Sequence, residues 1–286
     1  MGKQTKKAGS EYGGEWTVEK LEIIDKYLGF YVDALKNQDW ARKIYIDAFA
    51  GSGKIILPDG TALEGSPSIA LKYDFEKYYF IEYDADRIKE LQEYIAITFP
   101  QKLGKVEFIR GDCNVELTKI FETLACNKNV RGVMFLDPYA LELKWNILEQ
   151  AKQKMCLDIW YLFPMMANRL LQKDKKIMDE YREKLNTLFG NNEWEKELYS
   201  ESPQYNMFDE IVYIKEPIDE LVKYIAKRLK DTFQYEPRIK HFKNSKNSSL
   251  FLLCFMITNP SKAAIALSRK VTREIFEKID KSKLLV

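Results

Sequence analysis

The feature that most constrains the fold of this chain is a regular alternation of apolar runs and helical patterns over residues 43–163. The apolar runs lie at 43–49, 78–82, 106–109, 132–136 and 157–163, and helix-periodic segments lie at 66–76, 85–97, 114–124 and 143–154. Strands that alternate with helices form βαβ units, with a parallel sheet and right-handed crossovers. The sequence therefore predicts an α/β fold with a doubly wound sheet.

Further helices and a hairpin are predicted on both sides of this core. Helical patterns run from Thr17, a plausible N-cap, to about Asn37, over 168–188, over 217–233, and from Pro260 to about Lys281. Two apolar runs, 235–242 and 249–258, are separated by a turn-rich spacer and predict a C-terminal hairpin. We expect a flexible basic tail over 1–15 and one domain over 16–286, with an insertion at about 165–215 that carries helix.

Composition excludes several classes of protein. The 45 Lys and Arg residues nearly balance the 43 Asp and Glu residues, so the formal net charge of +2 excludes a basic field over the whole molecule. No apolar run is long enough to span a membrane. With four cysteines, none of them in a C-x-x-C pair, and one histidine, we expect no metal site. The start of the sequence has no apolar signal segment, which favours a cytoplasmic location.

A glycine loop follows the first predicted strand, in the sequence Asp47-Ala-Phe49-Ala-Gly51-Ser-Gly53. Ligands bind at this carboxyl edge of a doubly wound sheet, and the two glycines let the backbone turn sharply beside a ligand. A phosphate-binding P-loop would need a glycine at Ala48 and a hydroxyl at Ile55, and a nicotinamide fingerprint would need a glycine at Ile56. Both of these nucleotide sites are disfavoured.

Acidic residues end the next two predicted strands. Glu82 can accept hydrogen bonds from both hydroxyls of a ribose, although it follows Gly53 by 29 residues where about 20 is usual. Asp112 can accept from an exocyclic amine such as that of adenine, or it can cap the helix that follows, and the two roles can coexist. Cys113 lies beside Asp112, but no base or positive group near it indicates a nucleophile.

The fourth strand ends in Asp137-Pro138-Tyr139. The aspartate can accept a hydrogen bond from an amine and keep the nitrogen lone pair directed at an electrophile. The proline fixes the turn, and the tyrosine ring can stack on a planar base. An Asp-Pro turn with no further role is the alternative for this segment taken by itself.

These motifs carry a resemblance. The FAGSG (49–53) and DPY (137–139) segments resemble the cofactor and catalytic motifs of class I S-adenosylmethionine-dependent amino-methyltransferases. From about residue 16 to about 275 the chain is similar to the three-Cys-motif partner protein family. The segments that carry this likeness are WTVEKLEIIDKYL (16–28), YIDAFAGSG (45–53), EGSPSIAL (64–71), FIEYD (80–84), GDCN (111–114), FLDPYAL (135–141) and DIWYLFPMMANRLL (158–171).

The resemblance implies a Rossmann-like class I methyltransferase sheet, S-adenosylmethionine as cofactor, and a partner protein with a three-cysteine motif that is similar to radical S-adenosylmethionine proteins. The cofactor would then contact Asp47, Phe49, Gly51, Gly53, Glu82, Asp112 and Cys113, and Asp137, Pro138 and Tyr139 would act on the target amine. Many amino-methyltransferases have two prolines before the tyrosine (DPPY), whereas this chain has only Pro138 before Tyr139, and Ala140 follows. Tyr139 is thus preceded by one proline only, which leaves guanine N2 as open as adenine N6.

A nucleic-acid substrate would need phosphate contacts, which basic side chains supply. The candidates for contact with the substrate are Asn168, Arg169, Arg238, Lys240 and Lys243. We expect methyl transfer to a base in DNA or RNA. The alternative from another class is a non-catalytic or regulatory scaffold that docks the three-cysteine protein.

Overall fold

The structure, a computed structural model, describes residues 14–57, 60–124, 129–205 and 211–283. Most of the predicted tail (1–15) lies outside the described residues. The helices are α1 (Glu15–Ala34), α2 (Ser66–Leu71), α3 (Ala85–Thr98), α4 (Cys113–Leu124), α5 (Trp145–Lys154), α6 (Asp179–Phe189), α7 (Trp194–Glu197), α8 (Ile218–Phe233), α9 (Lys262–Lys283) and the 3₁₀ helices η1 (Pro100–Lys105) and η2 (Met165–Arg169).

Seven strands form the central sheet, in the order β10-β11-β7-β6-β1-β4-β5. They are β1 (Arg42–Asp47), β4 (Lys77–Glu82), β5 (Val106–Arg110), β6 (Val130–Leu136), β7 (Leu157–Pro164), β10 (Arg238–Lys243) and β11 (Ser249–Ile257). Pairing is parallel from β5 to β7, whereas β11 runs antiparallel to both β7 and β10. This is the doubly wound, Rossmann-like α/β sheet that the sequence predicted, and it ends in the predicted C-terminal hairpin.

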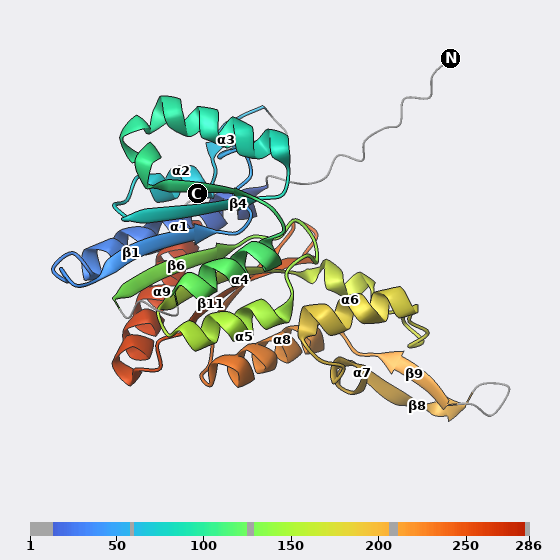
Figure 1. Cartoon of the computed structure of the whole chain (residues 1–286). Coiled ribbons are helices and arrows are strands. Elements are labelled where there is room, and N and C mark those ends of the chain that lie inside the picture. Colours follow the sequence, from blue (N-terminus) through green and yellow to red (C-terminus); the bar gives the residue numbers. More distant parts are fainter. Residues whose placement is uncertain (1–13, 58–59, 125–128, 206–210, 284–286) are drawn as a thin grey trace, which may run out of the picture.

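The strands are apolar on both sides because helices cover both faces of the sheet (Figure 1). In β1, Ile44 and Ile46 pack into a hydrophobic cluster with α4, α5 and α8, which we call the first cluster. Tyr45, between them, points to the opposite face and packs into a second cluster with α1, α2 and α9. The strand thereby presents alternate side chains to two cores.

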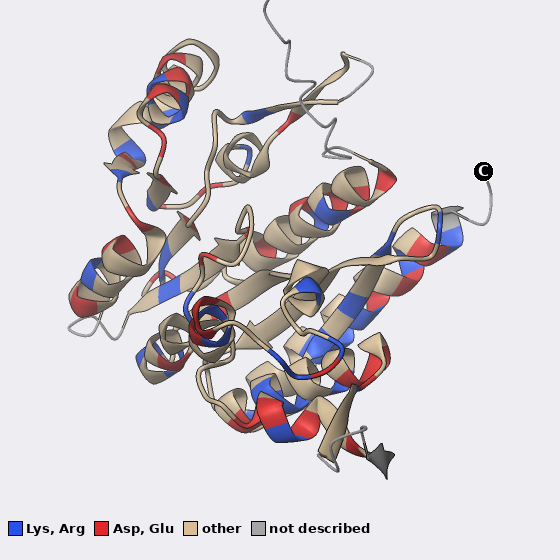
Figure 2. Ribbon diagram, turned by 90° about the vertical axis from the view of Figure 1, so that its right-hand side faces the viewer, with Lys and Arg blue, Asp and Glu red and all other residues tan. Residues whose placement is uncertain are grey.

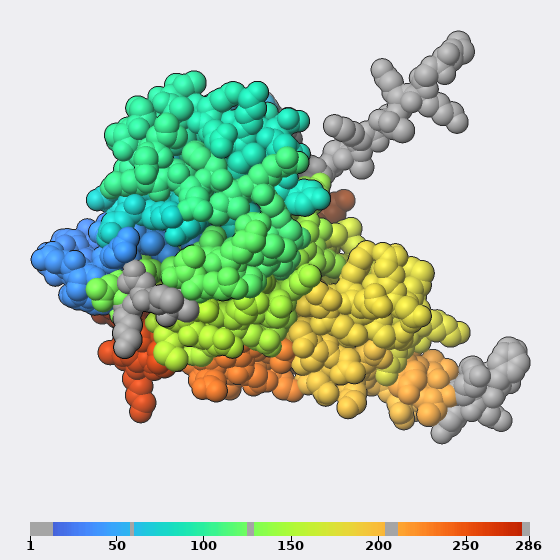
Figure 3. Space-filling model, in the orientation of Figure 1, coloured from blue at the N-terminus to red at the C-terminus, as the bar shows by residue number. Residues whose placement is uncertain are grey.

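Two short antiparallel pairs lie outside the central sheet. One is formed by β2 (Lys54–Ile56) and β3 (Ala62–Glu64), between β1 and α2. The other is formed by β8 (Tyr199–Tyr205) and β9 (Ile211–Lys215), and it projects from the body of the molecule beyond α7 (Figures 1 and 3). The segment predicted as an insertion therefore holds η2, α6, α7, β8 and β9.

Two predicted helix boundaries are wrong. The first helix begins at Glu15 with Gly14 as its N-cap, so Thr17 lies inside the first turn and does not cap it. The helix predicted over 168–188 forms only as α6, after the short η2. The Lys215 ammonium donates to the carbonyl oxygens of Asn168 (2.6 Å) and Leu171 (2.8 Å), which a continuous helix would use internally. No helix of the described part of the chain is both long and apolar enough to cross a membrane.

Candidate active site

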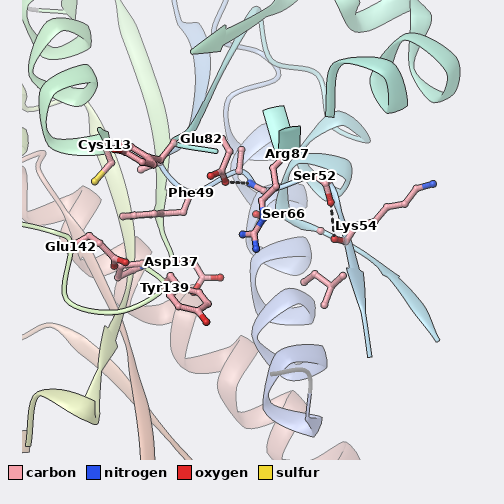
Figure 4. A pocket seen from close by; sticks show the side chains of 18 of the residues that line it. Phe49, Ser52, Lys54, Ser66, Glu82, Arg87, Cys113, Asp137, Tyr139 and Glu142 are labelled. Atoms are coloured by element: carbon pink, nitrogen blue, oxygen red, sulfur yellow. Dashed lines mark hydrogen bonds between the residues drawn. The ribbon is translucent and has the colours of Figure 1, made fainter. Parts of the chain in front are cut away.

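A cavity of about 890 Å³ opens at the carboxyl edge of the parallel strands. We call it the edge cavity (Figure 4). Its walls come from the segments that follow β1, β4, β5 and β6, together with the start of α1 and of β11. Of the residues predicted from sequence, the lining includes Phe49, Gly51, Gly53, Glu82, Asp112, Cys113, Asp137, Pro138 and Tyr139. The structure thus brings together residues that lie up to 90 positions apart in the sequence, from 49 to 139.

The glycine loop adopts a conformation that side-chain-bearing residues rarely take. Gly51 and Gly53 have φ angles of +60° and +78°. A Cβ on Gly53 would lie 2.7 Å from a Leu91 methyl group, whereas one on Gly51 would meet no atom within 4 Å. The lack of a side chain at Gly51 therefore keeps space open beside the backbone, where a bound molecule can approach it.

Glu82, the last residue of β4, connects the glycine loop to the tip of that strand through two hydrogen bonds. Its Oε2 accepts a hydrogen bond from the Gly51 amide at 2.9 Å, and its Oε1 accepts one from the Asp84 amide at 2.9 Å. Each carboxylate oxygen has a second lone pair. Glu82 can therefore hold the loop and still accept hydrogen bonds from two neighbouring hydroxyl groups in the cavity.

Asp47 is buried beneath the glycine loop, which it holds by a hydrogen bond, and it does not line the edge cavity. It is 0% exposed, and its Oδ1 accepts a hydrogen bond from the Phe49 amide at 3.2 Å. Burial raises the pKa of the Asp47 carboxyl to about 7, although hydrogen bonds from Ser66 and the Phe49 amide oppose the shift. Direct cofactor contact by Asp47 stays a prediction, while its support of the loop is visible in these bonds.

Asp112 caps α4 and also faces the edge cavity. Its Oδ1 accepts hydrogen bonds from the Asn114 amide at 2.8 Å and from the Val115 amide at 3.3 Å. Capping uses one carboxylate oxygen, so the two roles considered for Asp112 are compatible. Burial, followed by the charges of Asp112 and Glu142, raises the pKa of the neighbouring Cys113 thiol to about 12. A thiol of this kind is a poor nucleophile at neutral pH.

Asp137 and Tyr139 project from the tip of β6 into the edge cavity, near Glu142 (Figure 4). The Tyr139 side chain is well exposed, at 62%, which leaves its ring face accessible to a planar group. Glu142 accepts a hydrogen bond from the Ala140 amide at 2.7 Å and so fixes the turn after Tyr139. The arrangement is a carboxylate and an aromatic ring held side by side on a rigid turn.

The most important residue that sequence reasoning missed is Lys20 of α1. Its ammonium lies 2.5 Å from Asp137 Oδ2, and its side chain is only 4% exposed. Trp16, Thr17 and Lys20 all line the edge cavity, as do Ser66 and Arg87. The helical pattern predicted from Thr17 to about Asn37 gave no sign of a buried lysine. The WTVEK segment (16–20) appeared in the family resemblance, and this was the one available hint.

The five residues predicted to contact a substrate do not line the edge cavity. The Lys240 ammonium lies 3.0 Å from Glu19 Oε1 and also pairs with Asp280, so it is already neutralised. Asn168 uses its backbone carbonyl to hold Lys215, and Arg169 is exposed. Arg238 lines a separate hollow of about 340 Å³ between β10 and α9, and Lys243 is exposed at the end of β10. Their contact with a substrate stays a prediction.

Within the described residues, no group of three or more His, Cys, Asp or Glu side chains is arranged to hold a metal ion. Charged residues of both signs are spread over the helices (Figure 2).

Comparison with known proteins gives matches in structure only. No protein-family model matches the chain, and no curated protein matches its sequence. Protein LPL1258 from Legionella pneumophila aligns with 76% of this chain and 94% of its own, at 13% identity and a TM-score of 0.43. The methyltransferase domain of bacterial CtHen1-C aligns over 82% and 98%, at 12% identity and a TM-score of 0.39. The N-terminal domain of EvdMO1, solved in the presence of SAH and D-fucose, aligns over 82% of both chains, at 10% identity and a TM-score of 0.42.

Proposed function

We propose that this chain is an S-adenosylmethionine-dependent methyltransferase that acts on an exocyclic amine of a nucleic-acid base. One observation carries the proposal: the glycine loop, Glu82, Asp112 and Asp137-Pro138-Tyr139 all line one cavity at the carboxyl edge of the sheet. A structural role for each motif separately would not require them to face a common space. We also propose that residues 16–286 form one domain, in which the segment at about 165–215 is an insertion.

The edge cavity fits the proposed cofactor in its donor and acceptor groups. Open space beside Gly51 suits the methionine portion, the Glu82 carboxylate suits a ribose diol, and Asp112 suits the adenine amine. When bound, S-adenosylmethionine supplies a sulfonium methyl group, which moves to the acceptor nitrogen while the sulfur keeps the electron pair of the broken bond.

The residues of the chain orient the acceptor and receive its proton. Asp137 accepts a hydrogen bond from the acceptor N–H, which keeps the nitrogen lone pair free to form the new N–C bond. Tyr139 stacks on a base that has left its helix, at a cost of a few kcal/mol. The amine proton released by methylation passes through the Asp137 carboxylate to water. Positioning in the cavity supplies most of the acceleration.

The identity of the partner and the cellular location belong to the same proposal. A three-cysteine protein is proposed to dock on this chain, on the basis of the sequence resemblance. The three cysteines of the described residues are unpaired and buried, which is compatible with the reducing cytoplasm. The second candidate, a non-catalytic scaffold, is disfavoured because a scaffold has no physical need for an open cavity lined by these carboxylates.

The test combines calorimetry with a methyl-transfer assay on the full chain. Asp137→Ala should lower the rate of methyl transfer at least about 100-fold. It should leave the Kd for S-adenosylmethionine within about threefold, because Asp137 is assigned to the acceptor. Asp39→Ala, at an exposed carboxylate in a loop, is the matched control and should change neither quantity.

Glu82→Ala supplies the converse result. Loss of charge-assisted hydrogen bonds to the cofactor should weaken S-adenosylmethionine binding about 10- to 100-fold. Undiminished turnover by Asp137→Ala would remove this residue from the mechanism. Failure of the wild-type chain to bind S-adenosylmethionine, with or without the three-cysteine protein, would support the scaffold.

A further inference from the structure

The start of α1 forms one wall of the edge cavity, and the proposed function gives its residues no role. Trp16, Thr17 and Lys20 line the cavity together with Phe251 of β11. The Trp16 ring packs on Phe251 with ring centroids 4.6 Å apart, which fixes this wall against the sheet. Since Lys20 also reaches Asp137, the wall lies on the acceptor side of the cavity.

Lys20 occupies one of the two oxygens of Asp137. Its ammonium contacts Oδ2, and it lies 5.2 Å from the centre of the Trp16 ring and 5.9 Å from that of Phe135. Among the described residues, no donor reaches Oδ1, so this oxygen is left for the molecule that enters the cavity. Lys20 presents further N–H groups beside it, because an ammonium has three donors and no acceptor.

Thr17 adds a second group that points to a ligand. Its side chain is 3% exposed, and its Oγ1 has no hydrogen-bond partner among the described residues. A buried hydroxyl without a partner is unusual, because burial removes its bonds to water. Thr17 precedes Lys20 by three positions, so both side chains lie on one face of α1, toward the cavity.

We propose that Thr17, Lys20 and Asp137 select an acceptor whose amine is flanked, on the Watson–Crick edge, by a hydrogen-bond-accepting ring nitrogen, as in adenine or cytosine. Guanine is rejected because its N2 amine has N1–H on that edge and the acceptor N3 only on the side of the glycosidic bond. This inference rests on the function proposed above. The amine N–H would donate to Asp137 Oδ1, and the ring nitrogen would accept from Lys20. The Thr17 hydroxyl would bond to a further polar atom of the nucleotide.

Guanine fits the array of hydrogen-bonding groups on Thr17, Lys20 and Asp137 poorly on its Watson–Crick edge. There the N2 amine is flanked by N1–H, which is a donor and would face the ammonium of Lys20. A carboxylate that recognises N1–H and N2–H together needs both of its oxygens, and Lys20 already engages one of them. In adenine the N6 amine lies beside N1, and in cytosine the N4 amine lies beside N3, so each offers the donor and acceptor that the array requires.

The first experiment measures which base is methylated by the purified full chain. The probes are oligothymidylates that carry a single adenine, cytosine or guanine, and the matching oligouridylates, since thymine and uracil have no exocyclic amine. We expect methyl transfer to adenine or to cytosine and none to guanine. Transfer to guanine would overturn the inference and leave the proposed function intact. Cofactor binding with no transfer to any base would overturn both.

The second experiment separates a contact with the base from a purely structural role of Lys20. The preferred oligonucleotide is compared with one in which the flanking ring nitrogen is replaced by C–H, that is, 1-deazaadenine or 3-deazacytosine. In the wild-type chain the replacement should lower kcat/KM about 10- to 100-fold. In Lys20→Met it should lower kcat/KM less than about threefold, because the donor is already gone. Equal losses in both proteins would show that Lys20 does not contact the ring nitrogen.

Two further variants keep this result interpretable. Lys26→Met removes an exposed lysine from the same helix and should leave kcat/KM and the effect of the deaza base unchanged. Thr17→Val removes the hydroxyl at nearly constant volume. Because that hydroxyl has no partner among the residues that the structure describes, the melting temperature should not fall. Thr17→Val should still lower kcat/KM severalfold; an unchanged kcat/KM would remove Thr17 from the array.

Discussion

Asp47 shows how a single buried carboxyl can couple the stability of the glycine loop to pH. Burial raises its pKa to about 7, well above the value of about 3.9 for an unfolded chain. Between about pH 4 and pH 7 the native chain therefore holds a proton that the unfolded chain has released. The contribution of Asp47 to the free energy of unfolding therefore falls as pH rises through this window, and it is constant above it. Asp158, beside Tyr27, has a pKa raised in the same way, to about 7.

Asp47→Asn tests this coupling. The variant should gain stability relative to the wild-type chain as pH rises from about 4 to about 7, by at most about 4 kcal/mol. The measurement is urea unfolding at several pH values, which gives the difference in free energy of unfolding between the two proteins. Asp39→Asn, at an exposed site, is the control, and its difference should not vary with pH. A difference for Asp47→Asn that is equally flat would contradict the raised pKa.

The sequence was sufficient to predict those site residues that have a reactive or hydrogen-bonding side chain and lie at the end of a predicted strand. Glu82, Asp112 and Asp137 each follow a buried apolar run, so their place at one edge of the sheet could be predicted from the strand pattern. Lys20 could not be found in this way, because its contact with Asp137 joins positions 117 residues apart. Only the tertiary packing of α1 against the sheet shows that this lysine is buried and paired.

At the scale of elements, Lys240 joins β10 to two helices. Its side chain is 13% exposed, and it pairs with Glu19 of α1, which is 5% exposed, and with Asp280 of α9. Sequence reasoning named this lysine as a candidate for contact with a nucleic acid because basic side chains supply phosphate contacts. The structure gives it internal partners, which depend on the docking of α1 and α9 and could not be seen in the local sequence.

Lys240→Met should therefore destabilise the fold. Removal of Lys240 takes a counter-charge from the buried Glu19 carboxylate, at a cost of up to about 3–5 kcal/mol. The double variant Lys240→Met with Glu19→Gln should recover part of this loss, because the buried charge is also gone. Lys243→Met, at an exposed position of the same strand, should change the free energy of unfolding by less than about 0.5 kcal/mol. If Lys240→Met changes the free energy of unfolding as little as Lys243→Met does, the Lys240–Glu19 pair does not stabilise the fold.

At the scale of the whole molecule, the two hydrophobic clusters share one sheet. Trp145 and Trp194 are fully buried in the first cluster, and Trp160 is fully buried in the second. Trp194 belongs to the segment proposed as an insertion, yet it packs in the same cluster as α5. The packing thus agrees with the proposal of one domain over 16–286.

We expect the chain to unfold in a single transition. Urea unfolding followed by tryptophan fluorescence and by far-ultraviolet circular dichroism should give superimposable curves, because neither cluster can be exposed without opening the shared sheet. Two separated transitions would show that the segment at about 165–215 is a domain of its own. A Trp194→Phe variant identifies which signal comes from that segment.

The hydrogen bonds at Gly53 have a consequence for how chains of this kind are recognised in genomes. Its carbonyl oxygen accepts a hydrogen bond from the Gly65 amide at 2.8 Å and one from the Ser68 hydroxyl at 2.6 Å. These bonds hold together the two ends of the β2–β3 hairpin. We expect that residues added or removed between Gly53 and Gly65 would leave Gly51 and the tip of β4 in place. We therefore expect the interval between the glycines and Glu82 to vary among proteins with this site, and a search pattern that requires a fixed interval would overlook some of them.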